Sequence, residues 1–245
     1  MGQAGSVEQR SAIRAVVSIR PGDADKQQIL DALRAFSAAF PLEVVALRRI
    51  LSLKVDARDA DADGPVAGPL GVDVKERRLF DAVHALLQEQ AERTERGSNE
   101  ELMELLLVSF KRIIRWREMY RLCAKCAMKP FLSCLYLSPK LVQSALDAIA
   151  CMITAPPGNE ASEKADRWEM ANRRNFGESG GYEVLRSLLV QHSAESNRSS
   201  EKDAILVNVV LLFHVTLVSR RTTTDFLTCS QVREPKGRDH CLTKR

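Results

Sequence analysis

NFGESGGYEVLRSLLVQHS, residues 175–193, and AILVNVVLLFHVTLVS, residues 204–219, are the two stretches that decide the fold of this chain. The first joins a glycine pair, Gly180 and Gly181, to a short helical pattern with one apolar face. The second is apolar nearly all round, so we expect it to form a helix that is buried on most sides. A short half-buried helix followed by a fully buried one predicts a stacked helical repeat.

The rest of the chain shows the same helical period. Apolar residues at Ile29, Leu33, Phe36 and Phe40 share one helical face. A capping box at residues 98–101 and the Ser-Pro pair at residues 138–139 predict two further helix starts. We expect residues 159–174 to be a polar, partly helical insertion. The sequence predicts helices over residues 7–19, 26–40, 41–51, 75–90, 98–114, 120–128, 139–153 and 204–218.

The composition favours helices over sheets. Hydrophobic residues make up 45% of the chain and aromatic residues only 5%, which is typical of aliphatic helix packing. The net charge is +4, and seven basic against three acidic residues in positions 220–245 account for all of it. The remainder is therefore neutral, which argues against a dedicated nucleic-acid-binding domain.

The glycine corner and its flanking helices resemble the armadillo-like helical repeat superfamily. The resemblance rests on Asn175, the Gly180-Gly181 corner, Val184-Leu185 and Leu188-Leu189 on the helix that follows, and Ala204 with Asn208. Residues 121–153 are similar, with Pro130 in place of the glycine pair. The corner NFGESGGYEVL also resembles helical regions of BEACH-domain scaffolds. The resemblance implies an all-α, irregular, right-handed solenoid of roughly four units, a fold that commonly binds partners on an extended surface.

Four segments are predicted. Residues 1–53 form N-terminal helical units, 54–74 a flexible acidic linker, 75–219 the armadillo-like repeats, and 220–245 a disordered basic tail. The linker contains Asp59, Asp61, Asp63 and Gly64, the first half of a calcium-binding loop, but Leu70 stands where the closing Glu is needed. Because the last apolar helix has no repeat beyond it, the chain has the pattern of a fragment.

No cofactor and no metal are expected. Cys123 and Cys126 form a CxxC pair, but structural zinc sites usually have two such pairs, so we interpret these thiols as reduced and buried between helices. A zinc site and a redox pair are the alternatives. The histidines at 84, 192 and 214 lack a nucleophile nearby in sequence, and a histidine satisfied by a backbone carbonyl is the favoured interpretation. We therefore expect no enzyme activity and no small-molecule substrate.

The basic stretch 111–129 is the candidate interaction site. It holds seven basic residues and one acid, with Trp116 and Tyr120 between them. Because the core face of the preceding helix is apolar, we expect Arg112 and Arg115 to lie outside it. Spacing by four would put residues 117, 121, 125 and 129 on one face if the helix were continuous. A plain solvated helix face is the alternative. The predicted partner-binding residues are Arg112, Arg115, Trp116, Arg117, Arg121 and Lys125.

The sequence therefore predicts a cytoplasmic, non-enzymatic scaffold. Its expected partner is a protein, which it would bind by an acidic segment of that partner. No secretory signal is recognised, since the first residues lack an apolar core. One alternative is a peripheral, membrane-associated trafficking component acylated at Gly2, which fits the myristoylation pattern. The other is RNA binding through residues 111–129, although nucleic acid is the less favoured partner.

Overall fold

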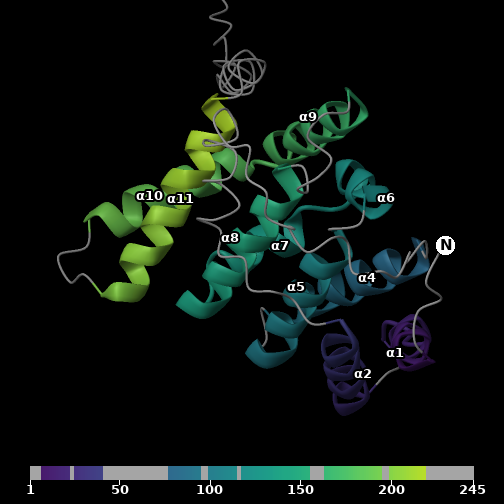
Figure 1. The fold of residues 1–245 in the computed structure, drawn as a ribbon. Helices are drawn as coiled ribbons and strands as arrows, with labels where there is room; N and C mark the ends of the chain where they lie inside the picture. The colour runs from purple at the N-terminus through teal and green to yellow at the C-terminus, as the bar shows by residue number, and fades with distance from the viewer. Residues whose placement is uncertain are drawn as a thin grey trace, which may run out of the picture.

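A computed structural model describes residues 7–22, 25–40, 77–94, 99–114, 117–154, 163–194 and 199–218 (Figure 1). Within these ranges the chain is all-α and contains no strand. The helices are α1 Val7–Val17, α2 Lys26–Ala39, α4 Arg77–Thr94, α5 Glu100–Ile114, α6 Arg117–Tyr120, the 3-10 helix η1 Arg121–Lys125, α7 Lys129–Cys134, α8 Pro139–Ile153, α9 Glu163–Glu178, α10 Gly181–Ala194 and α11 Ser200–Val218.

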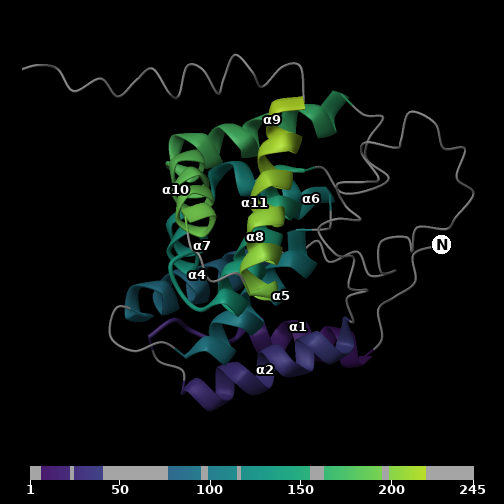
Figure 2. The same ribbon diagram turned by 90° about the vertical axis from the view of Figure 1, so that its left-hand side faces the viewer.

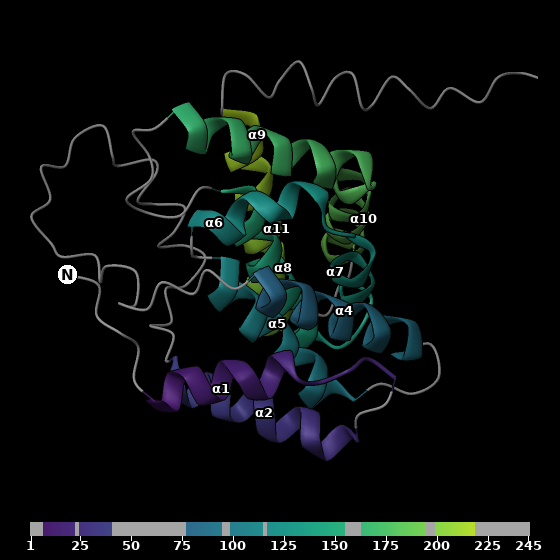
Figure 3. The same ribbon diagram turned by 90° about the vertical axis from the view of Figure 1, so that its right-hand side faces the viewer.

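The helices pack in a regular order. Neighbours along the chain pair as α1 with α2, α4 with α5, α7 with α8, and α10 with α11. The second helix of each pair also contacts the second helix of the next, so α2, α5, α8 and α11 contact one another in sequence. Figures 2 and 3 show α1 and α2 at one end of the molecule and α9 at the other. One large hydrophobic core runs through these contacts, and a small second cluster contains Tyr120 and Trp168.

The first pair turns at Gly22, which has a φ of 89°, a conformation that favours glycine. Its backbone N–H donates to Glu89 Oε1 on α4 at 3.1 Å, which ties the turn to the next pair. The apolar face predicted for residues 26–40 is confirmed, because Leu33, Phe36 and Phe40 are fully buried.

The long helix α9 is a structural element, which corrects the interpretation of residues 159–174 as an insertion; that they are partly helical is confirmed. Its Asn172 Nδ2 donates to the carbonyls of Tyr120 and Met152, at 3.2 and 2.9 Å. Arg173 Nε donates to the Ile153 carbonyl at 2.9 Å. These bonds satisfy carbonyls that the ends of α6 and α8 leave without intrahelical partners. Polar side chains of α9 therefore help to hold it on the core, together with the fully buried Phe176.

The glycine corner is confirmed, and its two glycines have different roles. Gly180 has a φ of 81°, which lets the chain leave α9. Gly181 begins α10 directly against the Phe176 ring, where a Cβ would lie 2.3 Å from a ring carbon. Phe176 is fully buried and meets Tyr182 edge-on at 5.1 Å between ring centres. The corner therefore depends on glycine for both conformation and space.

Two predictions about helices need correction. Helix α11 is buried on one face only: Ile205, Val209 and Leu212 face the core, whereas Val210 is 50% exposed. The reason is that α8 and α10 cover only its inner side among the described helices. The continuous helix through residues 120–128 is also wrong, because the chain tightens into η1 and turns before α7.

Several predicted features lie outside the described residues: the helix at 41–51, the acidic linker 54–74 with its half calcium loop, Ser98 of the capping box, the tail 220–245 and Gly2. None of the described helices combines the length and the hydropathy that a membrane crossing requires.

Candidate protein-interaction site

The predicted site residue Arg112 is half-buried between helices, which corrects the expectation that it lies wholly outside the packed face. Its guanidinium Nη1 donates to the hydroxyl of Ser37 on α2, so the side chain bridges two helices. Burial lowers the pKa of Arg112 because it disfavours the charged form. The cause is that α5 packs against α2, α4 and α8 together, which leaves it little solvent-facing surface. Arg112 thus connects helices.

Arg115 and Trp116 lie outside the described residues, and of Arg117 only the backbone is described, as the first residue of α6. Their part in the predicted site stays a prediction.

Arg121 and Lys125 lie on η1, and both side chains are exposed. A 3-10 helix has three residues per turn, so positions four apart point about 120° away from each other rather than along one face. The single stripe of cations expected for a continuous α-helix therefore does not form. The two cations instead spread over a tight turn.

The turn that carries these cations is held from α9. Asn175 Nδ2 donates to the carbonyls of Cys123 and Cys126, at 2.8 and 3.0 Å. Cys126 then adopts an extended conformation and ends η1. The Cys123 carbonyl also accepts the backbone N–H of Cys126 at 3.4 Å, the bond that closes η1, whereas Asn175 is the donor that ties both carbonyls to α9. This long-range contact sets where the basic stretch leaves the α-helical path.

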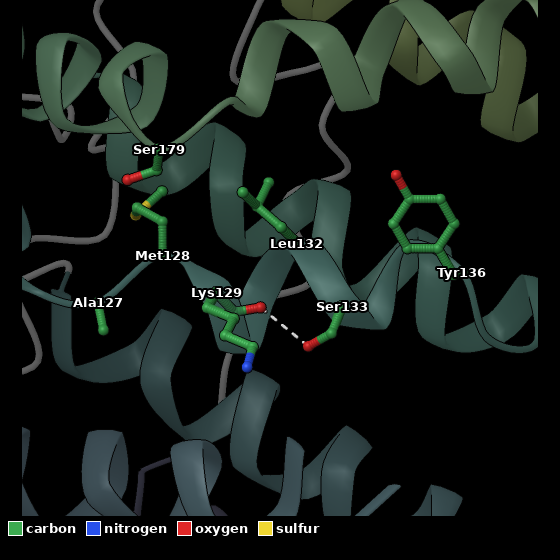
Figure 4. A pocket seen from close by; sticks show the side chains of 7 residues that line it. All are labelled: Ala127, Met128, Lys129, Leu132, Ser133, Tyr136 and Ser179. Carbon is green, nitrogen blue, oxygen red and sulfur yellow. Dashed lines mark hydrogen bonds between the residues drawn. The ribbon is translucent and has the colours of Figure 1, made fainter. Parts of the chain in front are cut away.

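A pocket of about 520 Å³ opens beside the turn (Figure 4). Leu132 lies along it between Met128 and the ring of Tyr136, and Ser179 approaches from the end of α9. Tyr136 is 63% exposed, which is unusual for a large aromatic side chain. The residues that line the pocket are Ala127, Met128, Lys129, Leu132, Ser133, Tyr136 and Ser179.

Lys129 joins this pocket to the basic turn. Its carbonyl accepts a 2.8 Å hydrogen bond from the Ser133 hydroxyl, shown dashed in Figure 4, while its side chain is exposed. Sequence reasoning counted Lys129 as part of the basic stretch but missed the pocket. The available signal was the spacing by four of Met128, Leu132 and Tyr136, which puts three large side chains on one side of α7 and its flanks.

Some basic side chains of this region have a described partner and others do not. Lys111 pairs with Asp147 on α8 at 3.0 Å, and Arg112 donates to Ser37. Arg121, Lys125 and Lys129 make no ion pair with any described residue. These three exposed cations and the pocket together are named the basic groove here. Lys129 places positive charge directly beside the apolar surface of the pocket.

The described thiols of residues 123–134 and His84 lie as the sequence predicts, whereas His214 does not. Cys123, Cys126 and Cys134 are buried, as expected, and burial raises the pKa of Cys134 to about 12. His84 Nε2 lies 3.1 Å from the Ala127 carbonyl, the backbone satisfaction that was predicted. His214 differs, because it is exposed on the outer face of α11. In the described part of the chain, no group of three or more His, Cys, Asp or Glu residues is placed to hold a metal ion.

Comparison with known proteins gives no family for this chain. No protein-family model matches it, and neither a curated protein nor a solved structure matches it.

Proposed function

We propose that this chain is a non-enzymatic, cytoplasmic interaction scaffold that binds an acidic segment of a protein partner in the basic groove. The observation that carries the proposal is that the exposed Lys129 lines an apolar pocket together with the exposed Tyr136, and that two further exposed cations, Arg121 and Lys125, lie on the turn that precedes the pocket in the chain. Carboxylates of a bound segment would pair with the cations, and an apolar side chain would enter between Met128 and Tyr136.

The architecture supports a scaffold of the armadillo-like kind. Four helix pairs follow one another, and their second helices α2, α5, α8 and α11 contact in chain order. This is the packing expected of a helical solenoid, in which each unit buries its apolar face on the next. Helix α6 and η1 lie between the second and third pairs, and α9 lies between the third and fourth, in keeping with an irregular member. Solenoids present long surfaces on which extended segments bind.

Charge and burial favour an acidic partner over a neutral one. Exposed ion pairs contribute only about 0–1 kcal/mol each, so the cations mainly speed and orient association. The apolar contact supplies the rest, because tyrosine and buried aliphatic side chains are frequent anchors at interfaces. A segment with two or three carboxylates around one aliphatic or aromatic residue fits both requirements.

A binding role also suits the chemistry of the described side chains. Burial raises the pKa of the Cys123 and Cys134 thiols, so both stay protonated at neutral pH, and protonated thiols are poor nucleophiles. His84 uses Nε2 on a backbone carbonyl. These residues support the helix packing, which is the basis for proposing a scaffold.

Selection from a random peptide display library tests the proposal. The full chain is the bait, and a variant with Arg121, Lys125 and Lys129 changed to Glu is used for subtraction. We expect enriched peptides to share Asp or Glu residues around one large apolar residue. Enrichment of basic or uncharged peptides that bind both baits equally would refute the proposal. Binding of a single-stranded RNA probe at about 150 mM salt, with no acidic peptide selected, would favour RNA instead.

A further inference from the structure

Three sulfur atoms gather where η1 ends and α7 begins. The Cys126 thiol lies 4.0 Å from Met128 Sδ and 3.2 Å from the Cys123 carbonyl, to which it donates. The Cys123 thiol adjoins it, and burial together with its hydrogen bond to Cys126 raises the pKa of Cys123. All three side chains are nearly inaccessible to solvent, with exposed fractions of 0%, 7% and 2% for Cys123, Cys126 and Met128. The site is a compact sulfur cluster.

The sulfur ligands of this cluster favour a soft metal ion. Thiolate and thioether sulfurs are soft ligands, and the combination of Cys with Met is suited to Cu(I). Metal–sulfur bonds of about 2.3 Å in a trigonal arrangement place the sulfurs roughly 4 Å apart, close to the Cys126–Met128 separation of 4.0 Å. Structural zinc sites usually have four nitrogen, oxygen or thiolate ligands, and no group of three or more His, Cys, Asp or Glu residues is placed to hold a metal ion in the described part of the chain.

The surroundings provide access and support. Met128 lines the pocket of the basic groove, and Figure 4 shows its sulfur next to Ser179 at the end of that pocket. Met128 is thus the member of the cluster that an ion in the pocket meets first. Asn175 holds the carbonyls of Cys123 and Cys126 at 2.8 and 3.0 Å, which fixes the turn that carries both thiols. Such outer contacts commonly orient metal ligands.

We propose that Cys123, Cys126 and Met128 form a binding site for one Cu(I) ion. The thiols release their protons to solvent as the copper–sulfur bonds form, while the Met128 thioether binds without a proton change. No electron is transferred, because copper enters and stays as Cu(I). The proposal does not depend on the acidic partner of the basic groove.

Anaerobic titration with Cu(I) in competition with bicinchoninate tests the site. The full chain is used with Cys229→Ser and Cys241→Ser, which removes two thiols outside the described residues. We expect about one Cu(I) per chain and a loss of affinity of at least about 100-fold in Cys123→Ser/Cys126→Ser. Met128→Leu, which keeps the apolar volume, should weaken binding about 10-fold or more. Cys134→Ser is the matched control, since Cys134 is a buried thiol bonded to the Pro130 carbonyl, and it should bind like the parent.

Two results would overturn the site. One is parental affinity in the folded Cys123→Ser/Cys126→Ser chain, and the other is an equal loss in Cys134→Ser. If the double variant does not fold, X-ray absorption of the copper-loaded parent decides. Three sulfur neighbours at about 2.3 Å support the site, whereas nitrogen or oxygen neighbours, or a sulfur count unchanged by Met128→Leu, contradict it.

Discussion

Gly181 at the start of α10 stands so close to Phe176 at the end of α9 that a single added methyl group would lie 2.3 Å from the phenyl ring. Phe176 is fully buried, so the ring cannot move into solvent to make room. Gly181→Ala should therefore lower the free energy of unfolding by about 1–3 kcal/mol, the usual cost of overpacking a core. Urea unfolding followed by circular dichroism measures this loss.

The matched control for this clash is Gly22→Ala. Gly22 also sits at a helix–helix turn, but a Cβ there would meet nothing within 4 Å, and only its φ of 89° opposes the change. We expect a cost of about 1 kcal/mol from backbone strain alone. Phe176→Leu should partly rescue Gly181→Ala, since it removes ring atoms at the contact. If Gly181→Ala costs the same in the parent chain as in a chain that already carries Phe176→Leu, the clash is contradicted.

A carboxylate should destabilise the chain on the buried face of α11 much more than on its exposed face. Leu212 is fully buried, whereas Val210 is 50% exposed on the same helix. Leu212→Asp should cost about 3 kcal/mol or more, because it both removes apolar burial and places a carboxylate in the core. Val210→Asp should stay within about 1 kcal/mol of the parent, since valine and aspartate have similar helix propensities. Thermal unfolding of the two variants measures the difference, and similar losses in both would show that the outer face is covered.

The contact from Asn175 should stabilise the turn that carries the basic groove. Asn175→Ala removes both hydrogen bonds, at 2.8 and 3.0 Å, and takes the α9 donor away from the carbonyls of Cys123 and Cys126. We expect a loss of about 1–3 kcal/mol, with faster amide hydrogen exchange in residues 121–127 than in α8. Arg174→Ala, at the exposed neighbouring position, is the control and should change stability by less than about 0.5 kcal/mol. Uniform exchange changes across the chain would contradict a local role.

The Cys134 thiol should make the chain less stable at alkaline pH. Burial raises its pKa to about 12, while a cysteine in the unfolded chain ionises near its ordinary pKa of 9.0. The unfolded state therefore loses its proton first, and stability falls as pH rises from about 9 toward 12. Urea midpoints measured between about pH 8 and 10.5 should fall less steeply in Cys134→Ala than in the parent. Parallel curves for the two proteins would show that Cys134 does not contribute.

The helices were predictable because the apolar residues repeat with a helical period. Leu33 and Phe36 mark the buried face of α2, and the glycine corner before α10 follows from local sequence alone. The break at η1 was not predictable, since it depends on Asn175, a residue some 50 positions away in the chain. Arg112 was misplaced for a related reason: the sequence shows one apolar face on α5 but not that α2 packs beside it. The pocket likewise requires α7 and the end of α9 to meet.

The most direct test of the basic groove is the affinity of an acidic, display-selected peptide, measured by fluorescence anisotropy at about 50 mM salt. Arg121→Glu/Lys125→Glu/Lys129→Glu should weaken binding at least about tenfold, which corresponds to about 1.4 kcal/mol. The same charge change at exposed cations far from the groove, Arg14→Glu/Arg20→Glu/Lys26→Glu, should change it less than about threefold. Unchanged affinity in the groove variant, or an equal loss in the remote one, would contradict binding at this site.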